Sequence, residues 1–292
     1  MKPRSARYLR AHDLEGALAL LAEHGDGARV LAGGQSLVPM MNLRTIAPSA
    51  LVDVNALDEL DYVRAENGHL AVGALTRTRT VERDPTVAER LPLLREAAAR
   101  VGHPAVRNQG TVGGNLAHAD PLNDLPPVLV ALDGQVVARG PRGERVIPAA
   151  ALFRGPGETS LEPGELLVEA RFPLLPRRTG SAFLEESRRG RGWGVAAVAA
   201  TITLAEDGTV AEARVALGCV GPAPVRARAA ETALRGAHPG LEAFAAAGEA
   251  AREDVVEPPS NVHGSAEYRR HLAGVLTTRA LAVAAARAEG AR

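Results

Sequence analysis

The stretch that decides the fold is Gly110-Thr-Val-Gly-Gly-Asn-Leu116, and it has an earlier counterpart in Leu31-Ala-Gly-Gly-Gln-Ser-Leu37. In each loop, paired glycines are followed by a polar side chain. Glycine tolerates positive φ and lets the backbone approach a ligand closely, and successive amides in such a turn can form a concave anion site. Ser36, Thr111 and Asn115 add hydroxyl or amide groups. The two loops therefore predict a site that grips one diphosphate from two sides.

Taken singly, either loop is equally well explained as an ordinary turn, because 30 glycines are spread through the chain. Two loops with matching chemistry favour the ligand site. Neither is a G-x-G-x-x-G fingerprint or a G-x-x-x-x-G-K-[ST] motif, so a Rossmann domain and a P-loop are poorly supported. If the glycines serve only a diphosphate, Gly33→Val and Gly114→Val should abolish cofactor binding and leave the fold largely intact.

The bulk composition sets limits on size, partners and compartment. A length of 292 residues suits two or three domains, and a formal net charge of zero gives no electrostatic reason to expect nucleic acid or an anionic membrane. Cys219 is the single cysteine, so an intrachain disulfide, a Cys-based zinc site and a [2Fe–2S] cluster held by this chain alone are excluded. We expect a cytoplasmic location, with no signal peptide and no membrane span.

Short helices and strands alternate up to about residue 175, which is typical of an α+β or α/β domain. Asp13 caps a predicted helix, Gly25 and Gly27 end it, and Asn67–Gly68 predicts a hairpin. Strands are expected at residues 29–32, 51–54, 62–64, 69–72, 135–138 and 166–172, and helices over residues 80–100, interrupted near Pro85 and Pro92, and 122–132.

The pattern changes after residues 173–180, a proline-containing segment that we interpret as a linker. Strands are expected at residues 181–187, 195–204 and 210–220, with a turn at Asp207–Gly208. Three alanine-rich helical segments follow, the last over residues 265–288. This half of the chain therefore predicts a small antiparallel sheet backed by helices, in which Cys219 is a buried residue at the end of a strand.

At the glycine loops the chain closely resembles the medium, flavin-binding chain of the xanthine dehydrogenase and carbon monoxide dehydrogenase (molybdenum hydroxylase) family. The family pattern A-G-G-x-S-L-x-P-x-M-x-L-R is similar to residues 32–44, and R-N-x-G-T-[IV]-G-G-N-[IL]-x-x-[AG]-x-P-x-x-D to residues 107–124. Residues 265–280 resemble the family's C-terminal helix, so the likeness covers essentially the whole length, in the right order.

The resemblance implies an α+β architecture. Residues 1–175 would form a two-subdomain FAD-binding fold of the vanillyl-alcohol oxidase (PCMH) type, divided at about 1–55 and 56–175 with the cofactor between the subdomains. Residues 176–292 would form a C-terminal molybdenum-hydroxylase flavoprotein domain, an antiparallel sheet with helices.

FAD is the cofactor that the resemblance implies, with no metal held by this chain and no catalytic residue of its own. The expected cofactor-binding residues come from the two loops, their flanks and later positions: Arg29, Leu31, Ala32, Gly33, Gly34, Gln35, Ser36, Leu37, Gly110, Thr111, Gly113, Gly114, Asn115, Ala117, Asp120, Asp124 and Trp193. Among these, Asp124 matches an acidic position suited to a ribose hydroxyl or a backbone amide.

Some candidates keep two interpretations. The family often has Gly-Asp-[FWY]-[AS] where this chain has Gly192-Trp-Gly-Val195. Trp193 would either lie against the flavin ring or pack between the two domains. His118 and Asp120 would form an acid–base pair or, as we favour, would shape the loop or touch the adenosine half of FAD, because flavin electron transfer needs no protein acid. The acidic group that begins at Asp53 is expected to be a solvated surface: Asp53, Asp58, Glu59 and Asp61.

The function implied is that of an FAD-binding electron-transfer subunit of a molybdenum hydroxylase. A molybdopterin-binding large subunit would oxidise the substrate and a small subunit would carry two [2Fe–2S] clusters, in a dimer of heterotrimers. Electrons would leave through FAD to NAD, oxygen or a quinone, and the partner chain would choose the substrate. The alternative is a cofactor-free scaffold or a small-molecule binding protein that kept the fold. Intact glycines in both loops argue against it, since without a diphosphate nothing demands them.

Overall fold

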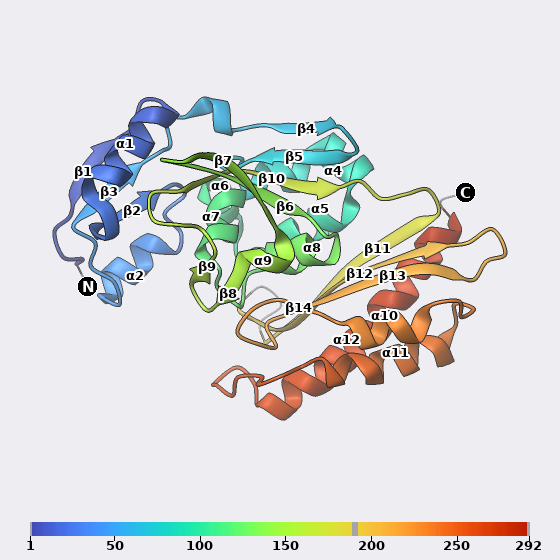
Figure 1. The fold of residues 1–292 in the computed structure, drawn as a ribbon. Coiled ribbons are helices and arrows are strands. Elements are labelled where there is room, and N and C mark those ends of the chain that lie inside the picture. Colours follow the sequence, from blue (N-terminus) through green and yellow to red (C-terminus); the bar gives the residue numbers. More distant parts are fainter. Residues whose placement is uncertain (1, 189–191, 291–292) are drawn as a thin grey trace.

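The computed structural model describes residues 2–188 and 192–290, arranged as three sheet-containing units side by side (Figure 1). The first unit is a parallel sheet in the order β1-β3-β2, with α1 packed beside it, where Asp13 caps α1 by accepting the N–H of Gly16. Its elements are β1 (Arg7–Arg10), α1 (Leu14–His24), η1 (Gly25–Gly27), β2 (Ala28–Leu31), α2 (Leu37–Leu43), β3 (Ala50–Asp53) and η2 (Asp58–Leu60).

The middle unit is a five-stranded antiparallel sheet in the order β4-β5-β10-β6-β7, with helices packed against it. Asn67 and Gly68 have φ values of 48° and 77°, which confirms the hairpin between β4 and β5. Its strands are β4 (Val63–Glu66), β5 (His69–Gly73), β6 (Gln135–Gly140), β7 (Gly143–Pro148) and β10 (Leu166–Pro173). A small two-stranded sheet pairs β8 (Phe153–Gly155) with β9 (Glu158–Thr159).

Prolines start three helices of the middle unit. Pro85, Pro92 and Pro104 each occupy the first turn of a helix, where no backbone N–H is needed. The interruptions predicted within residues 80–100 are therefore helix starts. The helices are α3 (Thr78–Arg83), α4 (Pro85–Arg90), α5 (Pro92–Arg100), α6 (Pro104–Gln109), α7 (Val112–His118), α8 (Leu125–Ala131) and α9 (Ala149–Leu152).

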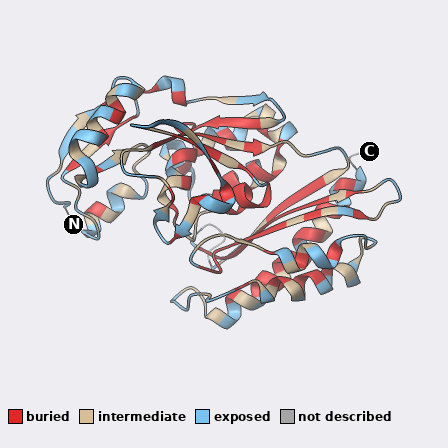
Figure 2. Cartoon of the chain, in the orientation of Figure 1, coloured by how far each residue is buried: buried red, intermediate tan, exposed pale blue. Residues whose placement is uncertain are grey.

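The third unit has the predicted antiparallel sheet, in the order β11-β12-β13-β14, backed by helices. All but one residue of β12 is buried, because α12 covers one face of the sheet and helices of the middle unit contact the other (Figure 2). The elements are β11 (Thr179–Ser187), β12 (Gly194–Leu204), β13 (Val210–Gly218), β14 (Val225–Arg226), α10 (Arg228–Leu234), α11 (Leu241–Glu253) and α12 (Ala266–Gly290).

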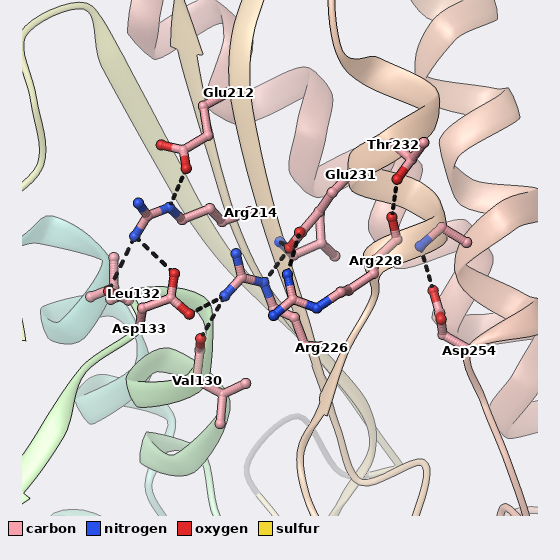
Figure 3. A network of polar contacts seen from close by, with 12 residues as sticks. Val130, Leu132, Asp133, Glu212, Arg214, Arg226, Arg228, Glu231, Thr232 and Asp254 are labelled. Carbon is pink, nitrogen blue, oxygen red and sulfur yellow. Dashed lines mark hydrogen bonds and ion pairs between the residues drawn. The ribbon is translucent and has the colours of Figure 1, made fainter. Parts of the chain in front are cut away.

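Two arginines of the third unit grip the end of α8 in the middle unit (Figure 3). Arg226 Nη1 donates to the Val130 carbonyl at 3.2 Å and to Asp133 at 2.5 Å. Arg214 Nη1 donates to the Leu132 carbonyl at 3.2 Å and lies 3.4 Å from Asp133. Cations are favourable at the C-terminus of a helix, so these contacts tie the two units together.

A buried arginine organises the third unit internally. Arg269 of α12 is 0% exposed, and its Nη1 donates to the carbonyls of Val195 and Cys219 at 2.7 and 2.8 Å. Further bonds run to the Pro259 carbonyl and to Asn261. Cys219 is buried just after β13, as predicted. In the described parts of the chain, no helix combines the length and apolar character that a membrane crossing requires.

Candidate cofactor site

The two glycine loops touch backbone to backbone. A Cβ placed on Gly33 would lie 2.1 Å from the Gln109 carbonyl oxygen and 2.8 Å from Gly110 Cα. A Cβ on Gly113 would lie 2.6 Å from that of Ala74. These positions need glycine for protein packing, whether or not a ligand binds. The expectation that only a diphosphate demands the glycines, and that Gly33→Val would spare the fold, is therefore wrong.

The first loop presents unpaired backbone donors. It follows β2, turns at Gly34 with φ of +69°, and leads into α2. The carbonyls of Gly34 and Ser36 accept from Val38 and Met40 at 3.0 and 3.1 Å. The N–H groups of residues 33–37 donate to no protein acceptor within the described residues. Five consecutive amides are thus left for solvent or for an anion.

The second loop uses its amides inside the protein. Val112 donates to Thr76 at 3.0 Å and Gly113 to the Ala74 carbonyl at 2.9 Å. Gly114 and Asn115 donate to the Thr111 hydroxyl and carbonyl, at 3.1 and 3.0 Å. The expectation that both loops present backbone amides is corrected, because these four amides of the second loop are already committed.

What the second loop offers a ligand is side chains. The Thr111 hydroxyl accepts a hydrogen bond from Gly114 but keeps its own hydrogen for donation. Asn115 Oδ1 is buried and has no hydrogen-bond partner in the parts of the chain described here. A buried polar atom without a partner is costly, so a ligand that supplies a donor at this place would stabilise the site.

A cavity of about 370 Å³ adjoins the first loop. Volumes of roughly 300–1,000 Å³ are usual for sites of small molecules and cofactors. The cavity is lined by the first loop, the start of α2 and one residue after β3: Leu31, Ala32, Gly33, Gly34, Gln35, Val38, Pro39, Asn42 and Asn55. Together with the open amides, it fits a ligand that carries a diphosphate, as FAD does.

Asp124 is a buried carboxyl beyond the second loop, at the start of α8. Its Oδ1 also has no hydrogen-bond partner among the described residues. Burial raises the pKa of Asp124 well above its ordinary value, nearby Glu185 raises it further, and Arg100 opposes this. Burial likewise raises the pKa of Glu185 to about 7, against the opposing effect of Arg100. A protonated carboxyl can donate a hydrogen bond to a cofactor, and the cofactor role of Asp124 stays a prediction.

The structure separates the alternatives for two other candidates. Trp193 is 57% exposed, so its packing between the domains is wrong, and its position against the flavin ring stays a prediction. Asp120 accepts the N–H of Leu122 at 2.9 Å, whereas His118 Nε2 lies 3.8 Å from Asp120 Oδ2. That separation is too long for a hydrogen bond, and the contact with Leu122 favours the loop-shaping role.

Three of the remaining expected residues lie at the margins of the site. Arg29 donates to the carbonyls of Asp26 and Ala28, near the start of β2, whereas the glycine loop follows its end. Leu37 begins α2, and Ala117 packs against the core of the middle unit. Their contacts with a cofactor stay predictions.

Asp53 and Asn55 support the first loop, a role that the sequence did not indicate for either residue. Asp53 is 9% exposed, so its assignment to a solvated surface is wrong. Its carboxylate accepts the backbone N–H and the side-chain amide of Asn55 at 2.9 and 2.7 Å, and the hydroxyl of Tyr8. The same amide donates to the Ala32 carbonyl at 2.9 Å. Asn55 thereby anchors the first loop to the end of β3.

Arg77 connects the two loops and was also missed. Its Nη2 donates to Asn55 Oδ1 at 2.9 Å, and its Nη1 donates to the Gln109 carbonyl at 2.6 Å. Asn55 and Arg77 lie far from the glycines in sequence, and the signal available was an Asp-x-Asn pattern at a strand end. Such a pattern forms a local turn in many contexts, so it could not identify the contact.

Comparison with known proteins gives two family matches that cover most of the chain. Residues 4–175 match the FAD binding domain in molybdopterin dehydrogenase. Residues 181–284 match the CO dehydrogenase flavoprotein C-terminal domain. The two matches follow one another along the chain and account for all three sheet-containing units.

Individual relatives match over nearly their whole length. The chain is 43% identical to the 6-hydroxypseudooxynicotine dehydrogenase complex subunit alpha of Paenarthrobacter nicotinovorans over 288 residues, covering 99% of this chain and 97% of that protein. It is 38% identical to the carbon monoxide dehydrogenase medium chain of Hydrogenophaga pseudoflava, covering 98% and 99%.

A solved structure of carbon monoxide dehydrogenase from Hydrogenophaga pseudoflava, which lacks the Mo-pyranopterin moiety of its cofactor, contains a similar chain. That chain superimposes with a TM-score of 0.95 at 40% identity, covering 98% of this chain and 99% of the other. Fold, cofactor loops and sequence therefore agree, and the chain belongs to the family of FAD-binding medium subunits of molybdenum hydroxylases, the flavoprotein subunits of carbon monoxide and xanthine dehydrogenases.

Proposed function

We infer that this chain receives electrons from [2Fe–2S] clusters of a partner subunit and passes them through FAD to an external acceptor. The observation that carries this proposal is the row of five amides at residues 33–37, which have no acceptor in the part of the chain that the structure describes and lie beside a cavity of about 370 Å³. A diphosphate accepts hydrogen bonds from such a row. The lone cysteine leaves the clusters to another chain.

The chain's own residues bind and orient the cofactor. Bound FAD would accept electrons singly and release them in pairs, and this redox chemistry belongs to the cofactor. The first loop would hold the diphosphate with its backbone amides. Thr111 and Asn115 would add side-chain contacts from the second loop. Asp124 would bind through a carboxyl group whose raised pKa favours the protonated form.

The partners we propose are a molybdopterin-binding large subunit and a [2Fe–2S] small subunit, in a dimer of heterotrimers. Two observations support them: one relative is a subunit of a dehydrogenase complex and another is a medium chain. We place the complex in the cytoplasm, because the single buried cysteine suits a reducing compartment. We also propose domain boundaries at 1–175 and 176–292, with FAD between subdomains 1–55 and 56–175.

Purification of the full chain tests the proposal in two steps. The chain alone, soaked with FAD and desalted, should be yellow with flavin absorption. The same chain recovered from its natural host should bring a large subunit with molybdenum and a small subunit with iron. A colourless chain after soaking would count against the cofactor site. A yellow chain recovered without molybdenum or iron would count against the electron-transfer complex.

A further inference from the structure

Arg77 is a half-buried cation at the contact between the two glycine loops. It is the N-cap residue that precedes α3, and a backbone hydrogen bond joins its segment to the second loop: Thr78 donates to the Gly110 carbonyl at 2.9 Å. Its guanidinium reaches the first loop through Asn55 and the second through the Gln109 carbonyl. One side chain therefore spans both halves of the site.

Among the described residues, only neutral groups contact the charged guanidinium of Arg77. No carboxylate pairs with it in the parts of the chain that the structure describes, and its two acceptors there are an amide and a carbonyl oxygen. By contrast, Arg107 beside the second loop pairs with Glu82 at 2.9 Å. Neither loop contains Lys or Arg, whereas a diphosphate carries two or more negative charges. An anion at the loops would therefore meet, in Arg77, a cation that no carboxylate among the described residues compensates.

We propose that Arg77 is a positioning residue of the FAD site, which holds the first loop against the second and supplies positive charge to the diphosphate. The inference rests on the proposed binding of FAD at these loops. It assigns two separable contributions to Arg77. The bidentate contact to Asn55 and Gln109 sets the spacing of the loops, and the charge favours an anionic ligand.

Two substitutions separate these contributions. Arg77→Lys keeps the charge but loses the planar fork that joins Asn55 to Gln109. Arg77→Gln removes the charge. The matched control is Arg139→Gln, since Arg139 lies on β6 and pairs with Glu15 at 3.2 Å, away from both loops.

The binding experiment is a titration of the full cofactor-free chain with FAD at several salt concentrations. Loss of one charge-assisted contact predicts an increase in Kd of about 10- to 100-fold for Arg77→Gln. We also expect a shallower dependence of Kd on salt for Arg77→Gln and an unchanged one for Arg77→Lys. Wild-type affinity with wild-type salt dependence in Arg77→Gln would overturn the proposal.

Amide hydrogen exchange of the same proteins without FAD tests the spacing role independently. The hydrogen-bonded amides around the contact between the loops, those of Val38, Thr78 and Val112, should exchange faster in both Arg77 variants than in the wild type and in Arg139→Gln. Unchanged exchange would remove the positioning role, even where binding is weakened. This measurement needs no cofactor, so it tests the contact between the loops separately from FAD binding. A wild-type chain that failed to bind FAD would refute the proposed function, and the exchange measurement would still decide the role of Arg77 at the contact.

Discussion

The two glycine loops look alike in sequence but do different work. The first keeps five backbone amides open and is held from outside by Asn55. The second donates the amides of residues 112–115 to its own structure and closes itself with the Thr111 hydroxyl. The first loop therefore presents hydrogen-bond donors to a ligand, and the second loop supports the first.

Each loop also has a carboxyl group nearby, and the pKa values of the two move in opposite directions. Burial alone would raise the pKa of Asp53, but hydrogen bonds from Tyr8 and Asn55 outweigh it and lower that pKa. Beyond the second loop, burial raises the pKa values of Asp124 and Glu185. Two similar glycine motifs can therefore lie near carboxyl groups that favour opposite protonation states: the charged form near the first loop and the protonated form beyond the second.

The largest effect that would break this comparison is expected at Gly33. Gly33→Ala should lower the free energy of unfolding by about 3 kcal/mol and prevent FAD binding, because its Cβ would overlap the Gln109 backbone. Gly114→Ala should cost about 1 kcal/mol, since its Cβ would meet only the Thr111 hydroxyl and no backbone atom, and alanine favours the helix. Urea unfolding and FAD titration measure both. Equal losses at the two positions would erase the difference between the loops.

Asp53→Asn tests the support of the first loop. At pH 7 the variant should lose about 2 kcal/mol, because the hydrogen bonds from Asn55 and Tyr8 are weakened. A carboxyl whose pKa is lowered in the folded state stabilises the fold above its unfolded pKa, and this contribution is lost as the pH falls through the folded value. The cost of the substitution should therefore shrink below about pH 4.

Urea unfolding at pH 7 and pH 3 measures this change, with the exposed Asp58→Asn as control. A cost for Asp53→Asn that did not vary with pH would contradict the role of its charge.

Glu185→Gln tests the opposite case beyond the second loop. The pKa of Glu185 is raised to about 7, so the folded state keeps a proton that the unfolded chain releases near its ordinary pKa. The stability of the wild type should therefore fall between about pH 4.5 and 7. Glutamine removes this loss, and we expect the variant to be more stable than the wild type at pH 8 by about 1 kcal/mol, after allowance for solvent screening.

Thermal or urea unfolding across that pH range gives the answer, and Glu206→Gln in the exposed turn after β12 should show no such effect. If the stabilities of Glu185→Gln and the wild type changed with pH in the same way, the effect assigned to the raised pKa of Glu185 would be refuted.

The smallest effects are expected from the two hydroxyls. Thr111→Ala removes the cap of α7 and should cost about 1 kcal/mol of stability. Ser36, at the N-cap of α2, makes no capping hydrogen bond with its side chain. Ser36→Ala should change stability by less than about 0.5 kcal/mol and raise the Kd for FAD about fivefold, the equivalent of one neutral hydrogen bond. Urea unfolding and FAD titration measure both variants. If Ser36→Ala lowered the stability and Thr111→Ala changed only the Kd for FAD, the roles assigned to the two loops would be reversed.

Local signals in the sequence were enough to predict much of the fold. Asp13 located the start of α1, Asn67–Gly68 the hairpin, and the apolar run from Val195 the central strand β12. The short strand β1 was missed, because Arg7–Arg10 has only four residues, begins and ends with arginine, and is mostly exposed. The helix interruptions at Pro85 and Pro92 were predicted correctly. Whether a proline ends one helix or begins the next depends on packing that neighbouring residues do not reveal.

For the cofactor site, the sequence indicated which loops form the site. It did not indicate that the first loop presents backbone amides and the second loop presents side chains. Whether a backbone N–H is free for a ligand depends on acceptors elsewhere in the chain. The N–H of Gly113 donates to the carbonyl of Ala74, 39 residues earlier, and the N–H of Val112 donates to the carbonyl of Thr76. The chain from Asp53 through Asn55 to Arg77 is likewise built from residues that tertiary structure brings together. Such contacts leave no periodicity or motif, so they could not be predicted from one sequence.

The buried guanidinium of Arg269 has a consequence for biosynthesis. β12 is complete at residue 204, but the helix that covers its face begins at residue 266 and carries the arginine that fastens Val195 and Cys219. During translation the ribosome must therefore extend the nascent chain well past this apolar strand before its cover exists. In that interval the strand is open to pairing with other chains, so chaperone demand should be concentrated on the third unit, while the sheet that ends at residue 173 is already complete.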